Sequence, residues 1–133
     1  MIPADARWTL YGPGCDYDAD RRNSGMIEER GTVRRTLAPR GAIVRTEKGK
    51  RPQIIGTIGD PDALMQVMKV DDWNQVHVIA RGTTMQNIIN GQLMAMCIDE
   101  DQSFFTPKGL IGWSIEQFGF GRVSVKDIWL RKL

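Results

Sequence analysis

Turn-forming residues recur at short intervals along this sequence and divide it into brief segments. The segments between them are rich in β-branched and aromatic residues, and this spacing is typical of an all-β sandwich or barrel. The turns lie at Gly12-Pro13-Gly14, Asn23-Ser24-Gly25, Pro39-Arg40-Gly41, Asn90-Gly91 and Pro107-Lys108-Gly109. A chain of 133 residues suits one domain, 1–133. The sequence therefore predicts a single antiparallel β-sandwich.

The clearest local signal is a pair of hairpins over 75–98. The first strand, 75–81, alternates strictly, and its apolar face carries Val76, Val78 and Ala80. The second, 85–89, leads into Asn90-Gly91, a dipeptide favoured in type I′ turns because both positions need positive φ. Residues 92–98 then return as the partner strand.

Two more strands are expected at 110–117 and 122–130. In the second, Val123, Val125 and Ile128 are expected on the buried side. The step from Val125 to Ile128 breaks strict alternation, which predicts a bulge near Lys126-Asp127.

One short helix is predicted at about 61–69. Asp60 is a suitable N-cap and Pro61 suits the first helical position, while Asp62 complements the helix dipole. The apolar stripe consists of Ala63, Leu64, Val67 and Met68.

Composition excludes several classes of protein. No apolar run is long enough to span a bilayer, and residues 1–5 show no signal-peptide pattern. A net charge of +2 does not argue for nucleic acid. Cys15 and Cys97 are far apart and the chain has one histidine, His77, so no structural zinc site is predicted. The localisation stays open.

Residues 31–51 hold seven basic residues against the single acid Glu47. A phosphate-binding patch is one interpretation, but no aromatic residue interleaves the charges to stack on bases. We favour a solvated hairpin and loop. The basic residues are Arg34, Arg35, Arg40, Arg45, Lys48, Lys50 and Arg51.

Several short motifs occur in a recognisable order. They are Tyr11-Gly12, 16–20, 23–31, Leu37-Ala38-Pro39-Arg40-Gly41, Asp71-Asp72-Trp73-Asn74, 78–82, Ile89-Asn90-Gly91, Gly109-Leu110-Ile111-Gly112 and 125–130. As an ordered set they resemble the 3-keto-disaccharide hydrolase family across nearly the whole chain. The resemblance implies a concanavalin A-like jelly roll that acts on oxidised glycosides, in a family whose members are often exported.

The chain departs from the family pattern in two ways. The resemblance gives the family's opening strands no counterpart here, which leaves open sheet edges and predicts a homo-oligomer. Imidazoles of the family pattern are also replaced, by Asn87 and by Ser114 with Glu116. Loss of these groups argues against proton transfer or metal binding by the family's usual route.

The candidate site residues follow from these matches. The catalytic candidates are Glu28, Glu29, Arg30 and Glu116; the substrate-binding candidates are Asp16, Asn87, Ser114 and Trp8. Glu28 and Glu29 point to opposite faces of a strand, so only one can serve a given site. Surface carboxylates and a polar solvent face are the competing interpretations.

The sequence also allows predictions about cofactors and about the exposure of the tryptophans. No cofactor is firmly implied; Asp99-Glu100-Asp101 is the one loop suited to calcium, and a solvated loop is the alternative. Trp73 is expected to pack in the core, whereas Trp8 and Trp129 are expected to be exposed for sugar stacking.

Two functions remain open. The first is acid/base cleavage of a 3-keto-glycoside. The second is a non-catalytic β-sandwich that binds glycans or self-associates. Carbohydrate is the expected partner of both, with neither nucleic acid nor membrane.

Overall fold

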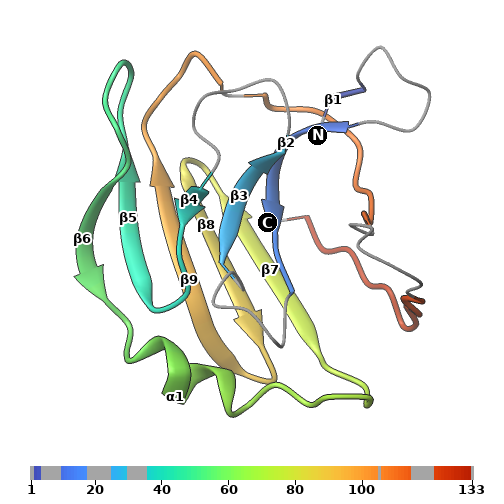
Figure 1. Ribbon diagram of the computed structural model, residues 1–133. Helices are drawn as coiled ribbons and strands as arrows, with labels where there is room; N and C mark the ends of the chain where they lie inside the picture. The colour runs from blue at the N-terminus through green and yellow to red at the C-terminus, as the bar shows by residue number, and fades with distance from the viewer. Residues whose placement is uncertain are drawn as a thin grey trace.

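The computed structural model describes residues 2–3, 10–17, 25–29, 36–104, 106–114 and 122–132. They form two β-sheets and one short helix (Figure 1). The elements are β1 (Ile2–Pro3), β2 (Leu10–Cys15), β3 (Met26–Glu29), β4 (Thr36–Ala38), β5 (Ala42–Thr46), β6 (Gln53–Thr57), α1 (Pro61–Met65), β7 (Val76–Arg81), β8 (Thr84–Ile89) and β9 (Gln92–Asp99). This architecture confirms the predicted all-β sandwich.

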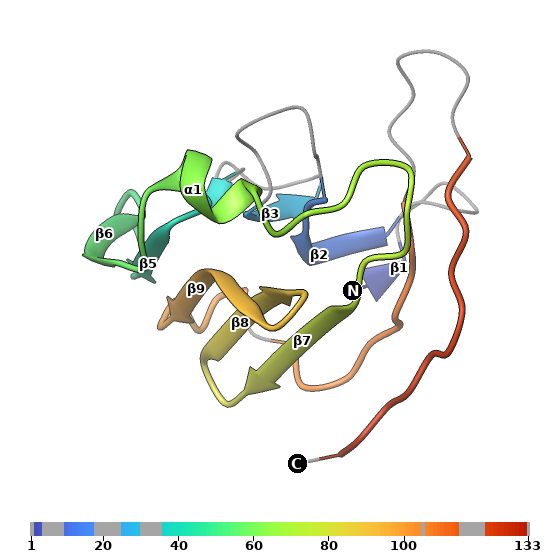
Figure 2. The same ribbon diagram turned by 90° about the horizontal axis from the view of Figure 1, so that it is seen from below.

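The two sheets stack face to face. The smaller has the strand order β1-β2-β3-β4 and the larger β6-β5-β9-β8-β7. Figure 2 shows the layers from below, with β2 and β3 on one side and β7, β8 and β9 on the other. Alternate side chains of each strand fill the space between, because successive residues of a strand point to opposite faces.

The core lies where β3 and β4 cover β5 and β9. One buried cluster comprises Met26, Leu37, Ala38, Ala42, Val44, Ala95 and Cys97. A smaller cluster, Leu64, Ile89 and Met94, lies where α1 closes the end of the sandwich. Helix α1 therefore covers this end of the core with Leu64.

The predicted hairpins and helix cap are confirmed. β7, β8 and β9 pair antiparallel in sequence order. Asn90 and Gly91 both have positive φ, 49° and 81°, as a type I′ turn requires. The Asp60 carboxylate accepts hydrogen bonds from the backbone N–H groups of Asp62 and Ala63 at 3.0 and 2.9 Å.

One pairing departs from the antiparallel expectation. β5 and β9 run parallel, with Val44 opposite Cys97 at the centre of the larger sheet. The 45 residues 47–91 separate these strands, so no local turn signal could have indicated the pairing. The segment between them contains β6, α1 and the β7–β8 hairpin.

The strands predicted at 110–117 and 122–130 are wrong over the residues that the structure describes. Residues 110–114 and 122–130 form no strand, and Val123, Val125 and Ile128 are exposed rather than buried. An alternating apolar pattern becomes a strand only when a neighbouring strand satisfies its backbone. The bulge expected near Lys126-Asp127 is therefore also wrong, because no strand forms there; Asp127 has a φ of 52° in an unpaired segment.

Candidate functional site

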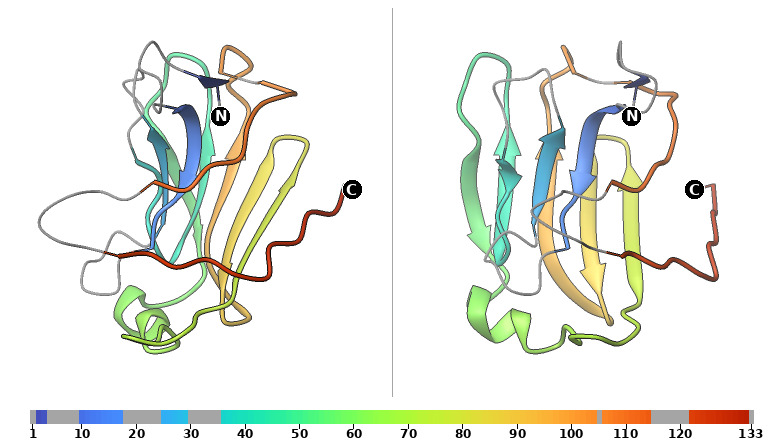
Figure 3. Two further views of the ribbon diagram at one scale, coloured as in Figure 1. Left: turned by 90° about the vertical axis from the view of Figure 1, so that its right-hand side faces the viewer. Right: turned by 45° about the vertical axis from the view of Figure 1, so that its right-hand side comes forward.

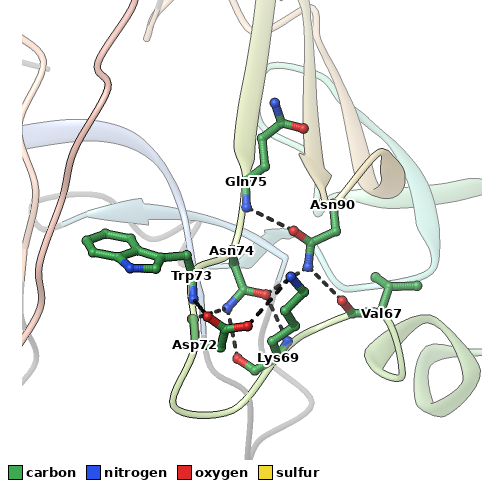
Figure 4. A network of polar contacts seen from close by, with 7 residues as sticks. All are labelled: Val67, Lys69, Asp72, Trp73, Asn74, Gln75 and Asn90. Carbon is green, nitrogen blue, oxygen red and sulfur yellow. Dashed lines mark hydrogen bonds and ion pairs between the residues drawn. The ribbon is translucent and has the colours of Figure 1, made fainter.

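The residues of the Asp72-Trp73-Asn74 and Asn90-Gly91 motifs meet at one end of the larger sheet (Figure 4). Asn74 Oδ1 accepts from the backbone N–H of Lys69 at 2.8 Å, and Asn74 Nδ2 donates to the backbone oxygen of Lys69 at 2.8 Å. The two asparagines also join directly, because Asn90 Nδ2 donates to Asn74 Oδ1 at 2.8 Å.

Asn90 extends this network to the segment after α1 and to the residue before β7. Its Nδ2 donates to the backbone oxygen of Val67 at 2.6 Å, and its Oδ1 accepts from the backbone N–H of Gln75 at 2.9 Å. The two asparagine side chains thus tie the segment after α1 to the β8–β9 turn. These motif residues hold the fold together rather than forming an open binding surface.

Trp73 does not pack in the core as expected. Its ring is half-exposed, and the ammonium group of Lys126 lies 4.2 Å from the ring centroid. This distance is that of a cation–π contact. It places the C-terminal segment beside the start of β7.

Five polar side chains are buried among the described residues; two of them are Thr46 and Asp101, and the other three are Glu28, Asn87 and Arg40. Glu28 lies two residues after the core residue Met26 on β3, so both side chains point to the inner face. Asn87 of β8 is fully buried, and its Nδ2 donates to the backbone oxygen of Gly25 at 3.3 Å. No hydrogen-bond partner is found for its Oδ1 in the part of the chain that the structure describes.

The third of these buried side chains is that of Arg40. The sequence predicted a solvated loop here, so the burial of Arg40 was missed. It is 2% exposed, in the turn between β4 and β5. A methyl group added to Gly25 would lie 2.9 Å from the Arg40 nitrogen, so Gly25 fits closely between this turn and Asn87. No local sequence signal indicated this burial, because the packing of the two sheets buries Arg40.

The other described basic residues of this stretch are at the surface. The side chain of Arg45 lies 3.7 Å from Glu100, and Lys50 pairs with Glu47. The hydrogen bond from Lys50 lowers the pKa of the Glu47 carboxyl. Arg34 and Arg35 lie outside the described residues.

The remaining candidates are divided among several places. Asp16 follows β2 and is partly buried, with its backbone N–H bonded to the Gly25 oxygen at 3.0 Å, and Ser114 is exposed. The Gly25 oxygen accepts hydrogen bonds from both Asp16 and Asn87. Glu28 lies three residues after Gly25, with its side chain on the inner face of β3. Trp8, Arg30, Glu116 and the side chain of Glu29 lie outside the described residues.

Burial also affects two groups at the end of β2. It raises the pKa of the Cys15 thiol to about 11, against a smaller opposing effect of the hydrogen bond with Tyr17. Burial likewise raises the pKa of Tyr17, and the neighbouring Cys15 raises it further. A thiol with a raised pKa stays in its neutral, weakly nucleophilic form near neutral pH.

The acidic loop after β9 is organised by its own hydrogen bonds. Asp99 accepts from Thr46 Oγ1, and the buried Asp101 accepts from the backbone N–H of Ser103 at 3.1 Å. Across the described ranges, no group of three or more metal-ligating side chains is brought together. Within them, too, no helix has the length and apolar character needed to cross a bilayer.

Comparison with known families decides the relationship. The pattern of the 3-keto-alpha-glucoside-1,2-lyase-like domain matches residues 3–131. The chain belongs to this family. No curated protein and no solved structure was found to match it.

The structure clarifies how this 3-keto-alpha-glucoside-1,2-lyase-like domain uses its matched motifs. Its asparagine motifs form the hydrogen-bond network of Figure 4. The buried Asn87 amide donates to the backbone oxygen of Gly25, and Gly25 lies close to the backbone of Arg40. The single histidine, His77, is exposed on β7, outside the buried polar group. Carboxylate, guanidinium and amide groups, rather than imidazole, are what the described interior offers for chemistry.

Proposed function

We propose that this domain binds a 3-keto-glycoside and cleaves its glycosidic bond by acid/base catalysis, with Glu28 as the base. Membership of a carbohydrate-active family supports the substrate class. The observation that carries the choice of residue is the burial of the Glu28 side chain on the inner face of β3. Carboxylates are mostly exposed in proteins, so its burial distinguishes Glu28 from the surface acids of the chain.

The chemistry needs a base, a proton donor and a stabiliser of negative charge. A carbonyl at C3 acidifies the proton on C2, and the base removes that proton to give an enolate. The electron pair then forms a double bond between C1 and C2, and the bond from C1 to the glycosidic oxygen breaks. That oxygen leaves with a proton from the acid. Addition of water, with OH to C1 and H to C2, completes hydrolysis.

The other roles are assigned by residue chemistry. A guanidinium group stabilises an enolate oxygen by charge and by paired N–H donors. Arg30 is our choice from the sequence, and Glu29 and Glu116 are the competing bases. The Asn87 amide, Asp16, Ser114 and Trp8 are proposed to hold the sugar.

Substitution of Glu28 by glutamine tests the assignment. Glu28→Gln keeps the shape and removes the base, so we expect turnover of a 3-keto-glucoside to fall about 100-fold or more. Glu47→Gln is the matched control, because Glu47 is a partly exposed carboxyl that pairs with Lys50 in the turn between β5 and β6, and we expect it to retain activity. Undiminished turnover by folded Glu28→Gln would remove Glu28 from the mechanism. Parallel assays of Glu29→Gln and Glu116→Gln would then identify the base.

A non-catalytic glycan-binding module is the second candidate. The absence of imidazole from the described interior favours it, as does the exposed ring of Trp129, on which a sugar can stack. The two functions are separated by assaying product release with and without added calcium or EDTA, alongside glycan binding. Binding without release would favour the second function. We expect no nucleic-acid partner under either.

A further inference from the structure

The inner face of the larger sheet is uncovered at its β6 end. Val44 of β5 and Ile54 of β6 are partners in the strand register, and directly opposed residues share a face, so both side chains point inward. Val44 is 1% exposed, whereas Ile54 is 68% exposed. The cover that the smaller sheet provides therefore ends between β5 and β6. The right-hand view of Figure 3 shows β6 as the outermost strand, clear of the blue strands β2 and β3.

A groove of about 510 Å³ lies at this place, between β4 and the start of β6. Its deepest part is formed by the core side chains Leu37 and Val44, each 1% exposed. Its rim consists of Thr36 and Pro39 on the side of β4, and of Arg51, Pro52 and Ile54 on the side of β6. Pockets of about 300–1,000 Å³ are those that hold small molecules in proteins. The groove therefore has the size of a small-molecule site.

Most of the groove lining is apolar. Three aliphatic side chains and two proline rings form it, and Thr36 brings its single hydroxyl group. No aromatic and no amide side chain is among the described residues that line it. A sugar needs several hydrogen-bond partners and a nucleobase needs a ring to stack on, so the lining matches neither. It matches an aliphatic chain, because burial of methylene groups is favourable in proportion to the area removed from water.

The one charge in the groove is the guanidinium group of Arg51. Two other cations on or beside the β5–β6 hairpin already have acidic partners, since Arg45 lies 3.7 Å from Glu100 and Lys50 pairs with Glu47. Within the described ranges, Arg51 has no such acid beside it. A guanidinium group binds a carboxylate through two parallel N–H donors. The exposed rim of the groove thus offers a site for an anionic group.

We propose that this groove binds an amphipathic carboxylate, a small molecule with an aliphatic chain and one anionic head group. The chain lies over Leu37 and Val44 and against Ile54, and the carboxylate meets Arg51 at the rim. The bound chain covers the inner face of β6 that the smaller sheet leaves open. A bare anion such as phosphate gains the charge of Arg51 but leaves the apolar lining in water.

Titration calorimetry of the full chain with octanoate tests the proposal. We expect saturable binding of one octanoate per chain. Acetate keeps the carboxylate without the long chain, and octanamide keeps the chain without the charge, so each is expected to bind about tenfold more weakly or worse. Inorganic phosphate is expected to bind no better than acetate. Octanamide or phosphate binding as tightly as octanoate would overturn the proposal.

Arg51→Gln and Ile54→Asp change the two parts of the groove separately. Both residues are exposed, so the fold is retained, and circular dichroism checks this. We expect Arg51→Gln to weaken octanoate binding about tenfold, because it removes a charge-assisted pair of hydrogen bonds. Ile54→Asp is expected to weaken it by a similar factor, since it replaces apolar lining with a like charge.

Lys48→Gln is the matched control. Lys48 is an exposed cation of the same hairpin and is not among the residues that line the groove. We expect this variant to bind octanoate as the wild type does. The proposal is wrong if the wild type shows no saturable octanoate binding, if either groove variant binds undiminished, or if Lys48→Gln loses as much affinity as Arg51→Gln.

Discussion

At the scale of single residues, Asn90 serves two purposes that one experiment can separate. It adopts a φ of 49°, and its side chain makes hydrogen bonds to Val67, Asn74 and Gln75. Asn90→Gly keeps the backbone conformation but loses these bonds, so we expect a loss of about 1–3 kcal/mol in unfolding free energy. Asn90→Ala should lose about 1 kcal/mol more, because alanine disfavours positive φ. Urea unfolding measures both, and equal stability of the two variants would contradict a strained turn.

Gly41 and Gly49 allow steric contact to be separated from backbone strain. Both have positive φ, 85° and 72°. A Cβ at Gly41 would lie 2.6 Å from the backbone oxygen of Gly59, whereas a Cβ at Gly49 would meet nothing within 4 Å. We expect Gly49→Ala to cost about 1–2 kcal/mol and Gly41→Ala clearly more. Thermal unfolding of the two variants checks this. A Gly41→Ala variant as stable as Gly49→Ala would show that the turn between β4 and β5 can shift to accommodate the added methyl group.

At the scale of elements, α1 is short enough to depend on its cap. Asp60 accepts two backbone N–H bonds at the start of a helix of only five residues. We expect Asp60→Ala to lower the unfolding free energy by about 1 kcal/mol, while Asp60→Asn, which caps equally well, changes it little. Chemical denaturation compares them. If the asparagine variant were as unstable as alanine, the charge rather than the cap would be responsible.

Elements set by neighbouring residues were predictable from the sequence, and those set by distant partners were not. The Asn90-Gly91 turn and the Asp60 cap depend on residues a few positions apart, and both are confirmed. The parallel pairing of β5 with β9 depends on contacts between remote segments. The segment 122–130 has a strand's pattern without a partner among the described residues, so its pattern alone predicted the wrong state.

At the scale of the whole molecule, the same distinction applies to the candidate site. Resemblance selected Glu28 and Asn87, but their burial between the sheets depends on which face each strand turns inward. Arg40 escaped notice because charge runs are usually solvated, and only tertiary packing buries it. Sequence could thus nominate side chains, whereas the stacking of two sheets decides which of them share an interior.

The sheet order also determines where the molecule should open first. β9 is paired on both sides, by β5 and β8, and carries the core residues Ala95 and Cys97. Among the described strands, β6 and β7 each have one neighbour in the sheet, and both carry exposed apolar side chains. Because local opening follows the number of buried contacts and paired amides, we expect hydrogen exchange to be slowest in β9 and β5 and faster in β6 and β7. Exchange measured by mass spectrometry on overlapping peptides would resolve these strands. Amides of β9 exchanging as fast as those of β6 would mean that the parallel pair is not the stable centre, and that the sandwich is held together elsewhere.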